Sequence, residues 1–235
     1  MVALNLETGL ALAGAALAIG LSGIGSVIGI TKIGQSTQVS LVEQPNRFGI
    51  GLIFTVLAES PAIYGLLVAI LIVLRIMENL SMPVAIAAFA AGLCMGVSGY
   101  FSAIGIGKAG ATAIGVLVER RELFGKSLIF TIFPETVAIY GLLTSIIILL
   151  PAGLTGEVVL TTIVQSFATV LAAIVVALTS TTGMYLGKVA STSIKTMLED
   201  ESLFGKFLIL AVLPESIAIY GLLIAIIILR GAGLL

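Results

Sequence analysis

Charged residues divide this chain into six long apolar stretches. Only 10% of its residues are charged and 59% are hydrophobic, whereas a soluble protein averages about 25% charged residues. Each stretch reaches or exceeds the roughly 20 residues that an α-helix needs to cross a bilayer. We therefore predict an all-α membrane protein with six transmembrane helices. The stretches cover residues 8–31, 48–74, 79–107, 127–156, 158–187 and 207–229.

A repeated motif groups the six stretches into pairs. The letters AIYGLL occur three times, each time three residues after a glutamate, and the glutamates are 76 and 80 residues apart. Repeats of this length accommodate two helices and their connections. We predict three tandem helical hairpins with the same orientation, at residues 1–79, 80–154 and 155–235.

The repeated glutamates are the candidate ion-binding residues. A charged carboxylate in the middle of a transmembrane helix costs roughly 2.5 kcal/mol or more, so such residues are functional candidates. We predict no catalytic residue, because the chain lacks a nucleotide-binding loop and a nucleophile constellation. It has no histidine, so no histidine metal site is expected, although Na⁺ could bind the same glutamates. These residues are Glu59, Glu135 and Glu215.

Hydroxyl groups recur around each glutamate. A serine or threonine follows it directly, and a tyrosine stands five residues later. Five residues turn a helix by roughly 140° from the starting direction, so each tyrosine is better placed to reach a neighbouring hairpin's glutamate than its own. The predicted supporting hydrogen-bond residues are Ser60, Thr136, Ser216, Tyr64, Tyr140 and Tyr220.

Proline marks the same places in two arrangements. Pro134 and Pro214 precede their glutamates, whereas Pro61 follows Glu59 by two residues. Because proline has no backbone N–H, the carbonyl four residues earlier in the helix loses its hydrogen-bond donor. The first hairpin therefore departs from the pattern of the other two.

No basic residue lies inside an apolar stretch that could neutralise these acids. The nearest to Glu59 in sequence are Arg47 and Arg75, roughly 18 and 24 Å away along a helix. We therefore expect the counter-charge to come from another subunit.

Basic residues predict the orientation in the membrane. Nine of the 11 lysines and arginines flank the loops between the two helices of a hairpin. The positive-inside rule then makes loops 1–2, 3–4 and 5–6 cytoplasmic and puts both termini outside. Acidic residues share these loops, which fits either a solvated surface or a docking surface for a soluble partner.

The first helices of the first two hairpins are rich in small residues, and that of the third follows this pattern less well because Ile174, Val175 and Val176 add bulk. Gly14, Gly25 and Gly29 belong to the first stretch, for example, and Gly105 and Gly107 to the third. Small residues let helix backbones approach closely in lipid. We predict that these helices pack tightly against one another and that they line the inside of an oligomeric ring.

The outer helices, which read AESPAIYGLL, PETVAIYGLL and PESIAIYGLL, resemble those of the proteolipid rotor subunits, called c or K, of A/V-type rotary ATPases and ATP synthases. The resemblance covers essentially the whole chain, in a three-hairpin form. It implies a homo-oligomeric ring in the cell membrane that translocates one ion per outer glutamate. It also implies an arginine on a stator membrane subunit and a central stalk on the cytoplasmic loops. No cofactor is expected beyond the translocated H⁺ or Na⁺.

The resemblance also bears on which ion is carried. Sodium-binding members of this family place one glutamine two residues before the basic residue of the inner helix and another two residues after the glutamate. A hard cation wants several oxygen ligands, and this chain has apolar residues at all six positions. We favour H⁺, with Na⁺ as the alternative. The positions hold Ile30, Ile106, Leu186, Pro61, Val137 and Ile217.

Two other functions fit the sequence less well. A self-contained proton-coupled transporter would need a substrate cavity with alternating access, usually built from inverted or distinct repeats, and direct repeats fit that poorly. A membrane scaffold would leave three buried acids unexplained. The net charge of −1 argues against a nucleic-acid partner.

Overall fold

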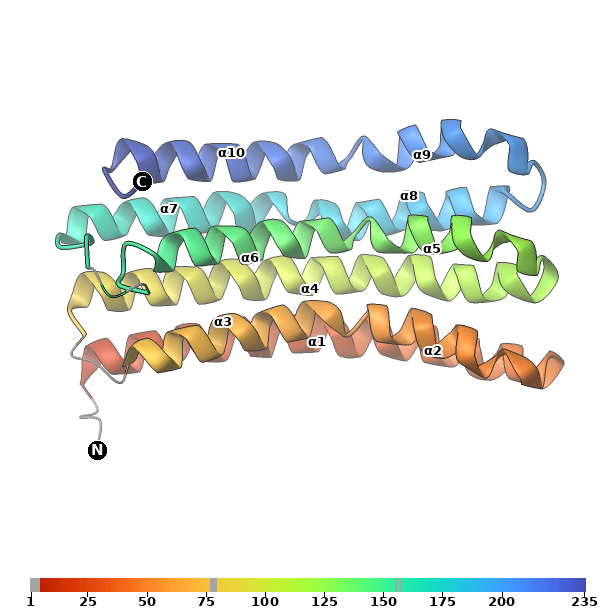
Figure 1. Ribbon diagram of the computed structural model, residues 1–235, viewed down its shortest axis with the longest axis horizontal. Helices are drawn as coiled ribbons and strands as arrows, with labels where there is room; N and C mark the ends of the chain where they lie inside the picture. Colours follow the sequence, from red (N-terminus) through yellow and green to blue (C-terminus); the bar gives the residue numbers. More distant parts are fainter. Residues whose placement is uncertain (1–4, 77–79, 155, 157) are drawn as a thin grey trace.

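The computed structural model describes residues 5–76, 80–154, 156 and 158–235, and folds them into three helical hairpins that lie side by side (Figure 1). The first contains α1 (Leu6–Glu43), η1 (Pro45–Arg47), α2 (Phe48–Leu57) and α3 (Ser60–Ile76). The second contains α4 (Met82–Glu119), η2 (Arg121–Leu123), α5 (Phe124–Ile132) and α6 (Glu135–Leu149). The third contains α7 (Ile163–Thr179), α8 (Thr182–Thr196), η3 (Glu201–Leu203), α9 (Phe204–Val212) and α10 (Glu215–Gly231).

The described residues form six helical segments long and apolar enough to cross a membrane. The predicted all-α, six-helix fold is thereby confirmed. The expected hairpin boundaries at 79/80 and 154/155 adjoin residues 79 and 155, which lie outside the described residues, so these boundaries stay predictions.

The inner helices are longer than predicted. The first and third apolar stretches ended at Lys32 and Lys108, but α1 and α4 are each 38 residues long and continue to Glu43 and Glu119. A lysine does not end a helix, since its long stem can carry the ammonium group away from apolar surroundings. At about 1.5 Å per residue these helices span roughly 57 Å, well beyond a hydrocarbon core of about 30 Å. The hairpin turns are correspondingly short.

The outer helix of every hairpin is interrupted at its glutamate. Helix α2 ends at Leu57 and α3 begins at Ser60; the second and third hairpins break before Glu135 and Glu215. The three interruptions lie at a similar depth in the bundle (Figure 1). Proline lacks the N–H that would continue the backbone ladder, and it produces the break whether it precedes the glutamate or follows it by two residues.

Glycine sets the distance between inner helices. An added Cβ at Gly14 would lie 2.6 Å from the carbonyl oxygen of Ala88, and one at Gly29 would lie 2.6 Å from that of Ala103. A Cβ at Gly105 would clash with the carbonyl oxygen of Gly183. The predicted tight packing is confirmed, because helix backbones touch where these glycines lie.

The inner helix of the third hairpin differs from the other two because it is interrupted between α7 and α8. Four consecutive hydroxyl residues, 179–182, bond back to carbonyls of the preceding turn, with Thr179 Oγ1 2.9 Å from the oxygen of Val175 and Thr182 Oγ1 2.8 Å from that of Thr179. Such bonds compete with the backbone ladder and bend helices. The apolar stretch alone did not predict this break.

Candidate ion-binding sites

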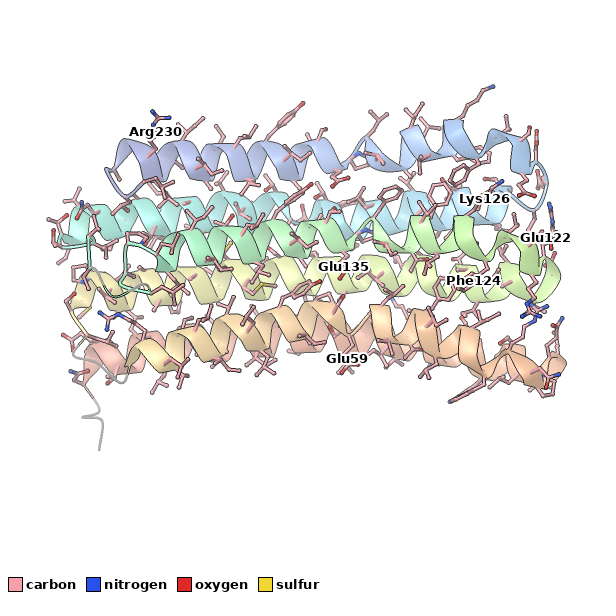
Figure 2. The ribbon with its side chains drawn as sticks, viewed as in Figure 1. Glu59, Glu122, Phe124, Lys126, Glu135 and Arg230 are labelled. Carbon is pink, nitrogen blue, oxygen red and sulfur yellow. The ribbon has the colours of Figure 1, made fainter. Side chains whose placement is uncertain are left out.

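The three glutamates lie at equivalent helix breaks but differ in exposure. Glu59 is exposed, Glu135 is half-buried and Glu215 is only 7% exposed. Figure 2 shows Glu59 on the outer edge of the first hairpin and Glu135 between the first and second hairpins. Glu135 and Glu215, which each lie beside a preceding hairpin, are thus more buried than Glu59.

Tyrosine hydroxyls join neighbouring hairpins at two of the glutamates. Tyr64 Oη in α3 donates to Glu135 Oε1 at 2.7 Å, and Tyr140 Oη in α6 donates to Glu215 Oε1 at 2.7 Å. Each tyrosine thus reaches the glutamate of the following hairpin, as the five-residue offset predicts. Tyr220 is 57% exposed on the far edge of the third hairpin.

The hydroxyls next to the glutamates bond to the backbone in this chain. Ser60 Oγ donates to the carbonyl of Leu57 at 2.9 Å, and Thr136 Oγ1 donates to that of Phe133 at 2.8 Å. Ser216 Oγ makes the same bond, to Leu213 at 2.9 Å. The support predicted from these side chains therefore goes to the helix breaks. The Leu57 carbonyl loses its helical donor because Pro61 has no N–H, whereas the carbonyls of Phe133 and Leu213 also accept from the backbone N–H groups of Thr136 and Ser216.

The glycine of the AIYGLL motif has its own role, which sequence reasoning missed. An added Cβ at Gly65 would clash with Ser22 Oγ of α1, and one at Gly141 would clash with the Ser98 side chain of α4. The tyrosine of the motif thus reaches the next hairpin while the glycine lets the outer helix approach its own inner helix. The immediate Tyr-Gly adjacency was the available signal.

Ion pairs lie at the hairpin turns, away from the glutamate sites. Within the part of the chain that the structure describes, none of Glu59, Glu135 and Glu215 forms an ion pair. A cation supplied by another subunit stays a prediction.

The turns of the second and third hairpins are joined by a small charge network. Arg120 contacts Glu122 at 2.8 Å and Glu201 at 2.7 Å, and Lys126 Nζ contacts Glu201 at 2.7 Å. The hydrogen bond to Glu122 raises the pKa of the Arg120 guanidinium above its ordinary value. Figure 2 places Glu122 and Lys126 toward the turn end of the bundle, remote from Glu135. Sequence reasoning placed these charges in the loops but not in contact.

The third site borders an open apolar groove. Leu208, Val212, Leu213 and Ile219 line a groove of about 410 Å³ that includes Glu215 and Ser216. In the described residues no cluster of three or more histidine, cysteine, aspartate or glutamate side chains could hold a metal ion. Each outer helix break holds one of the three glutamates.

Sequence comparison places this arrangement in a family. The family model that describes the C subunit of ATP synthase matches residues 13–72, 89–148 and 167–228, one match for each hairpin. The chain belongs to this family. The A-type ATP synthase subunit K of Methanocaldococcus jannaschii is 40% identical over 92% of this chain and 94% of its own length.

Shorter members of the family match part of the chain. The V-type sodium ATPase subunit K of Enterococcus hirae is 32% identical over 56% of this chain and 84% of its own length. The 16 kDa proteolipid of the V-type proton ATPase of Homo sapiens is 30% identical over 59% of this chain and 89% of its own length. The relatives' names include both a sodium and a proton form.

Proposed function

We propose that this chain is a membrane rotor subunit of an A/V-type ATP synthase or ATPase, in which Glu59, Glu135 and Glu215 each carry one ion. The chain acts as an ion-translocating subunit and is not an enzyme by itself. The observation that carries the proposal is the repeated bond of a tyrosine from one hairpin to the glutamate of the next, in a chain whose every hairpin matches the family of the ATP synthase C subunit.

The sites suit an acid that is loaded and unloaded in turn. A carboxyl group away from water prefers its neutral form, and a tyrosine hydroxyl holds its geometry without neutralising its charge. Moving one charge through 100 mV releases roughly 2.3 kcal/mol, so several ions accompany each ATP. Three acid-bearing hairpins let one copy of the chain carry three ions per turn.

The proposed partners supply a cation for the three glutamates, none of which forms an ion pair among the described residues. The unpaired glutamates call for a cation on another protein, which we assign to an arginine of a stator membrane subunit. The open groove beside Glu215 is a route by which such a group can approach. A central-stalk subunit docks on the charged turns, which the distribution of basic residues makes cytoplasmic, with both termini outside the cell membrane.

The competing transporter function is not favoured. Such a protein needs a substrate cavity between distinct or inverted repeats, whereas these hairpins are direct repeats with similar sites. Membership of the family of the ATP synthase C subunit also supports the rotor.

The decisive test removes one ion-carrying acid. In the reconstituted complex, Glu135→Gln should leave the ring assembled but lower ATP-driven ion uptake into vesicles at least tenfold, because a site that cannot ionise cannot release its ion. Glu7→Gln, a similar change in the first turn of α1, serves as the control and should leave uptake unchanged. Normal uptake by a uniformly Glu135→Gln ring would overturn the proposed function.

We favour H⁺ as the carried ion. Apolar residues stand at the positions where sodium-binding members supply amide oxygens, and the side-chain donors found at Glu135 and Glu215 are tyrosines. A proton needs only the carboxylate and one partner, whereas sodium wants several oxygens.

Carbodiimide labelling distinguishes the two ions. A proton site should react with carbodiimide at a rate that millimolar sodium does not change at alkaline pH, with potassium as the ionic-strength control. Slower labelling of the glutamates in sodium alone would show a sodium site and refute the proton assignment.

A further inference from the structure

The hairpin turns carry different charges at the two boundaries between hairpins. Between the second and third hairpins, Arg120 Nη2 and Lys126 Nζ each lie 2.7 Å from a carboxylate oxygen of Glu201. The acid of the third hairpin thus neutralises cations of the second. The equivalent positions at the boundary between the first and second hairpins, 76 and 80 residues earlier in the repeat, hold Gln44, Ile50 and Arg121.

A pocket of about 460 Å³ lies at this first boundary, and its charged side chains are arginines. Arg47 and Arg121 line it, and none of the described residues in its lining is acidic. Arg47 departs from the repeat, because the other two hairpins have Leu123 and Leu203 at its position. Neither arginine forms an ion pair with a described residue.

One atom of this pocket lacks the partner that its chemistry requires. Arg47 Nη1 is buried, and no described residue accepts a hydrogen bond from it. A buried donor without an acceptor is costly, more so when it belongs to a charged group. The first boundary therefore offers two guanidinium groups to an anion, where the second boundary supplies its own acid.

The same pocket has an apolar side that faces outward. Gly49, Ile50 and Ile53 of α2 line it, and Ile53 is 46% exposed. The apolar stretch of this outer helix starts at Phe48, directly after Arg47, at the turn end of the bundle (Figure 1). The pocket therefore lies where the lipid headgroups of a bilayer meet its hydrocarbon core.

We propose that this pocket, hereafter the arginine pocket, binds the phosphate group of an anionic phospholipid whose acyl chains pack on Ile50 and Ile53. Guanidinium groups suit phosphate because they donate two parallel hydrogen bonds to its oxygens, and basic pockets between membrane helices bind anionic headgroups. A free phosphate would leave the apolar side uncovered, whereas a lipid occupies both parts. The site goes beyond the rotor function and does not depend on it.

Arginine modification by phenylglyoxal tests the site in the unaltered ring. In nanodiscs of phosphatidylglycerol, Arg47 and Arg121 should react roughly fivefold more slowly than in nanodiscs of phosphatidylcholine, as mapped by peptide mass spectrometry. Arg230 is the control, because it is exposed and lies at the opposite end of the bundle (Figure 2). Its rate should be the same in both lipids.

The same measurement separates the lipid from other occupants. Inorganic phosphate added to the phosphatidylcholine nanodiscs should not protect Arg47, and equal protection would show a free-phosphate site and overturn the proposal. Equal modification in the two lipids would also overturn it. Protection that requires the soluble subunits of the complex, in either lipid, would mean that a protein covers the arginine pocket and would refute the lipid assignment.

A charge reversal gives a second test. Arg121→Glu places at the first boundary the acid that Glu201 supplies at the second, so Arg47 gains a partner within the chain. Native mass spectrometry of the purified ring should then show roughly fivefold less retained phosphatidylglycerol, whereas Arg230→Glu should retain as much as the parent.

Unchanged lipid retention by the Arg121→Glu ring would contradict the arginine pocket. Such a failure is distinct from failure of the rotor function, because the Glu135→Gln test measures ion uptake and neither arginine lies at a glutamate site.

Discussion

At the scale of single residues, the informative unit is a tyrosine and a glutamate from different hairpins. Tyr140 Oη and Glu215 Oε1 are 2.7 Å apart, with the glutamate almost fully buried. The bond fixes the carboxylate between two outer helices without supplying a charge. An ion-carrying acid needs that combination, because a permanent cation at the same distance would hold it ionised.

Tyr140→Phe should free Glu215 while the fold is retained. A hydrogen bond to a charged group contributes about 1.5–3 kcal/mol, and about 1.4 kcal/mol is a factor of ten, so its loss should raise carbodiimide labelling of Glu215 roughly tenfold or more. The measurement is peptide mass spectrometry after a fixed labelling time in the assembled ring. Tyr100→Phe, on an inner helix, is the control and should behave as the unchanged chain. Equal labelling of Glu215 in both variants would show that the bond does not hold the acid.

The tyrosine direction could be predicted from sequence because it depends on helical geometry alone. The hydrogen-bond partners of Ser60 and Ser216 could not be predicted from sequence. A hydroxyl in a helix can donate either to a neighbouring side chain or to a carbonyl of its own helical turn. Of the carbonyls expected to be freed by proline, that of Leu57 does accept a bond, from Ser60. The acceptors in the other hairpins are Phe133 and Leu213, one residue before the proline.

At the scale of helices, apolar length predicted how many helices there are but not where the inner ones end. The residues after Lys32 include Gln35, Ser36 and Gln38, whereas those after Lys108 are mostly small or apolar, and both segments are helical. A rule based on charge therefore ended the helices too early. The break between α7 and α8 was missed for a related reason, since hydropathy does not register hydroxyls that bond backward. Glycine contacts were predictable because close approach in lipid requires small residues.

Gly105→Ala tests whether glycine sets the distance between α4 and α8. Alanine normally stabilises a helix by about 1 kcal/mol relative to glycine. At Gly105 the new methyl would meet the backbone of Gly183 and the side chain of Pro134, and overpacking costs about 1–3 kcal/mol. We expect a lower unfolding temperature of the purified ring.

Gly115→Ala is the matched control on the same helix, because no atom lies within 4 Å of its added Cβ. That variant should be as stable as the parent or slightly more stable. If both substitutions changed the unfolding temperature alike, helix propensity and not backbone contact would explain the glycines.

At the scale of the whole molecule, three hairpins in one chain give two glutamates a tyrosine partner and leave Glu59 without one among the described residues. Glu135 and Glu215 receive their tyrosines from within the polypeptide, so their geometry is set when the chain folds. Sequence repeats could predict three similar sites, but this difference arises from which edges are free and became evident from the exposure of Tyr220 and Glu59 in the folded chain.

Mixed rings give a prediction that belongs to the assembly alone. If the copies turn as one body, a single Glu135→Gln chain stops every site in its ring, so uptake should fall far faster than the fraction of substituted chains. Independent transporters would instead lose activity in direct proportion. The experiment co-expresses both chains at graded ratios, measures the ratio in purified complexes by mass spectrometry, and records ATP-driven uptake for each. Glu7→Gln mixed in the same way should leave uptake unchanged at every ratio, which shows that mixing itself does no harm. If uptake fell in direct proportion to the fraction of Glu135→Gln chains, each chain would work independently. That result would contradict the rotor function.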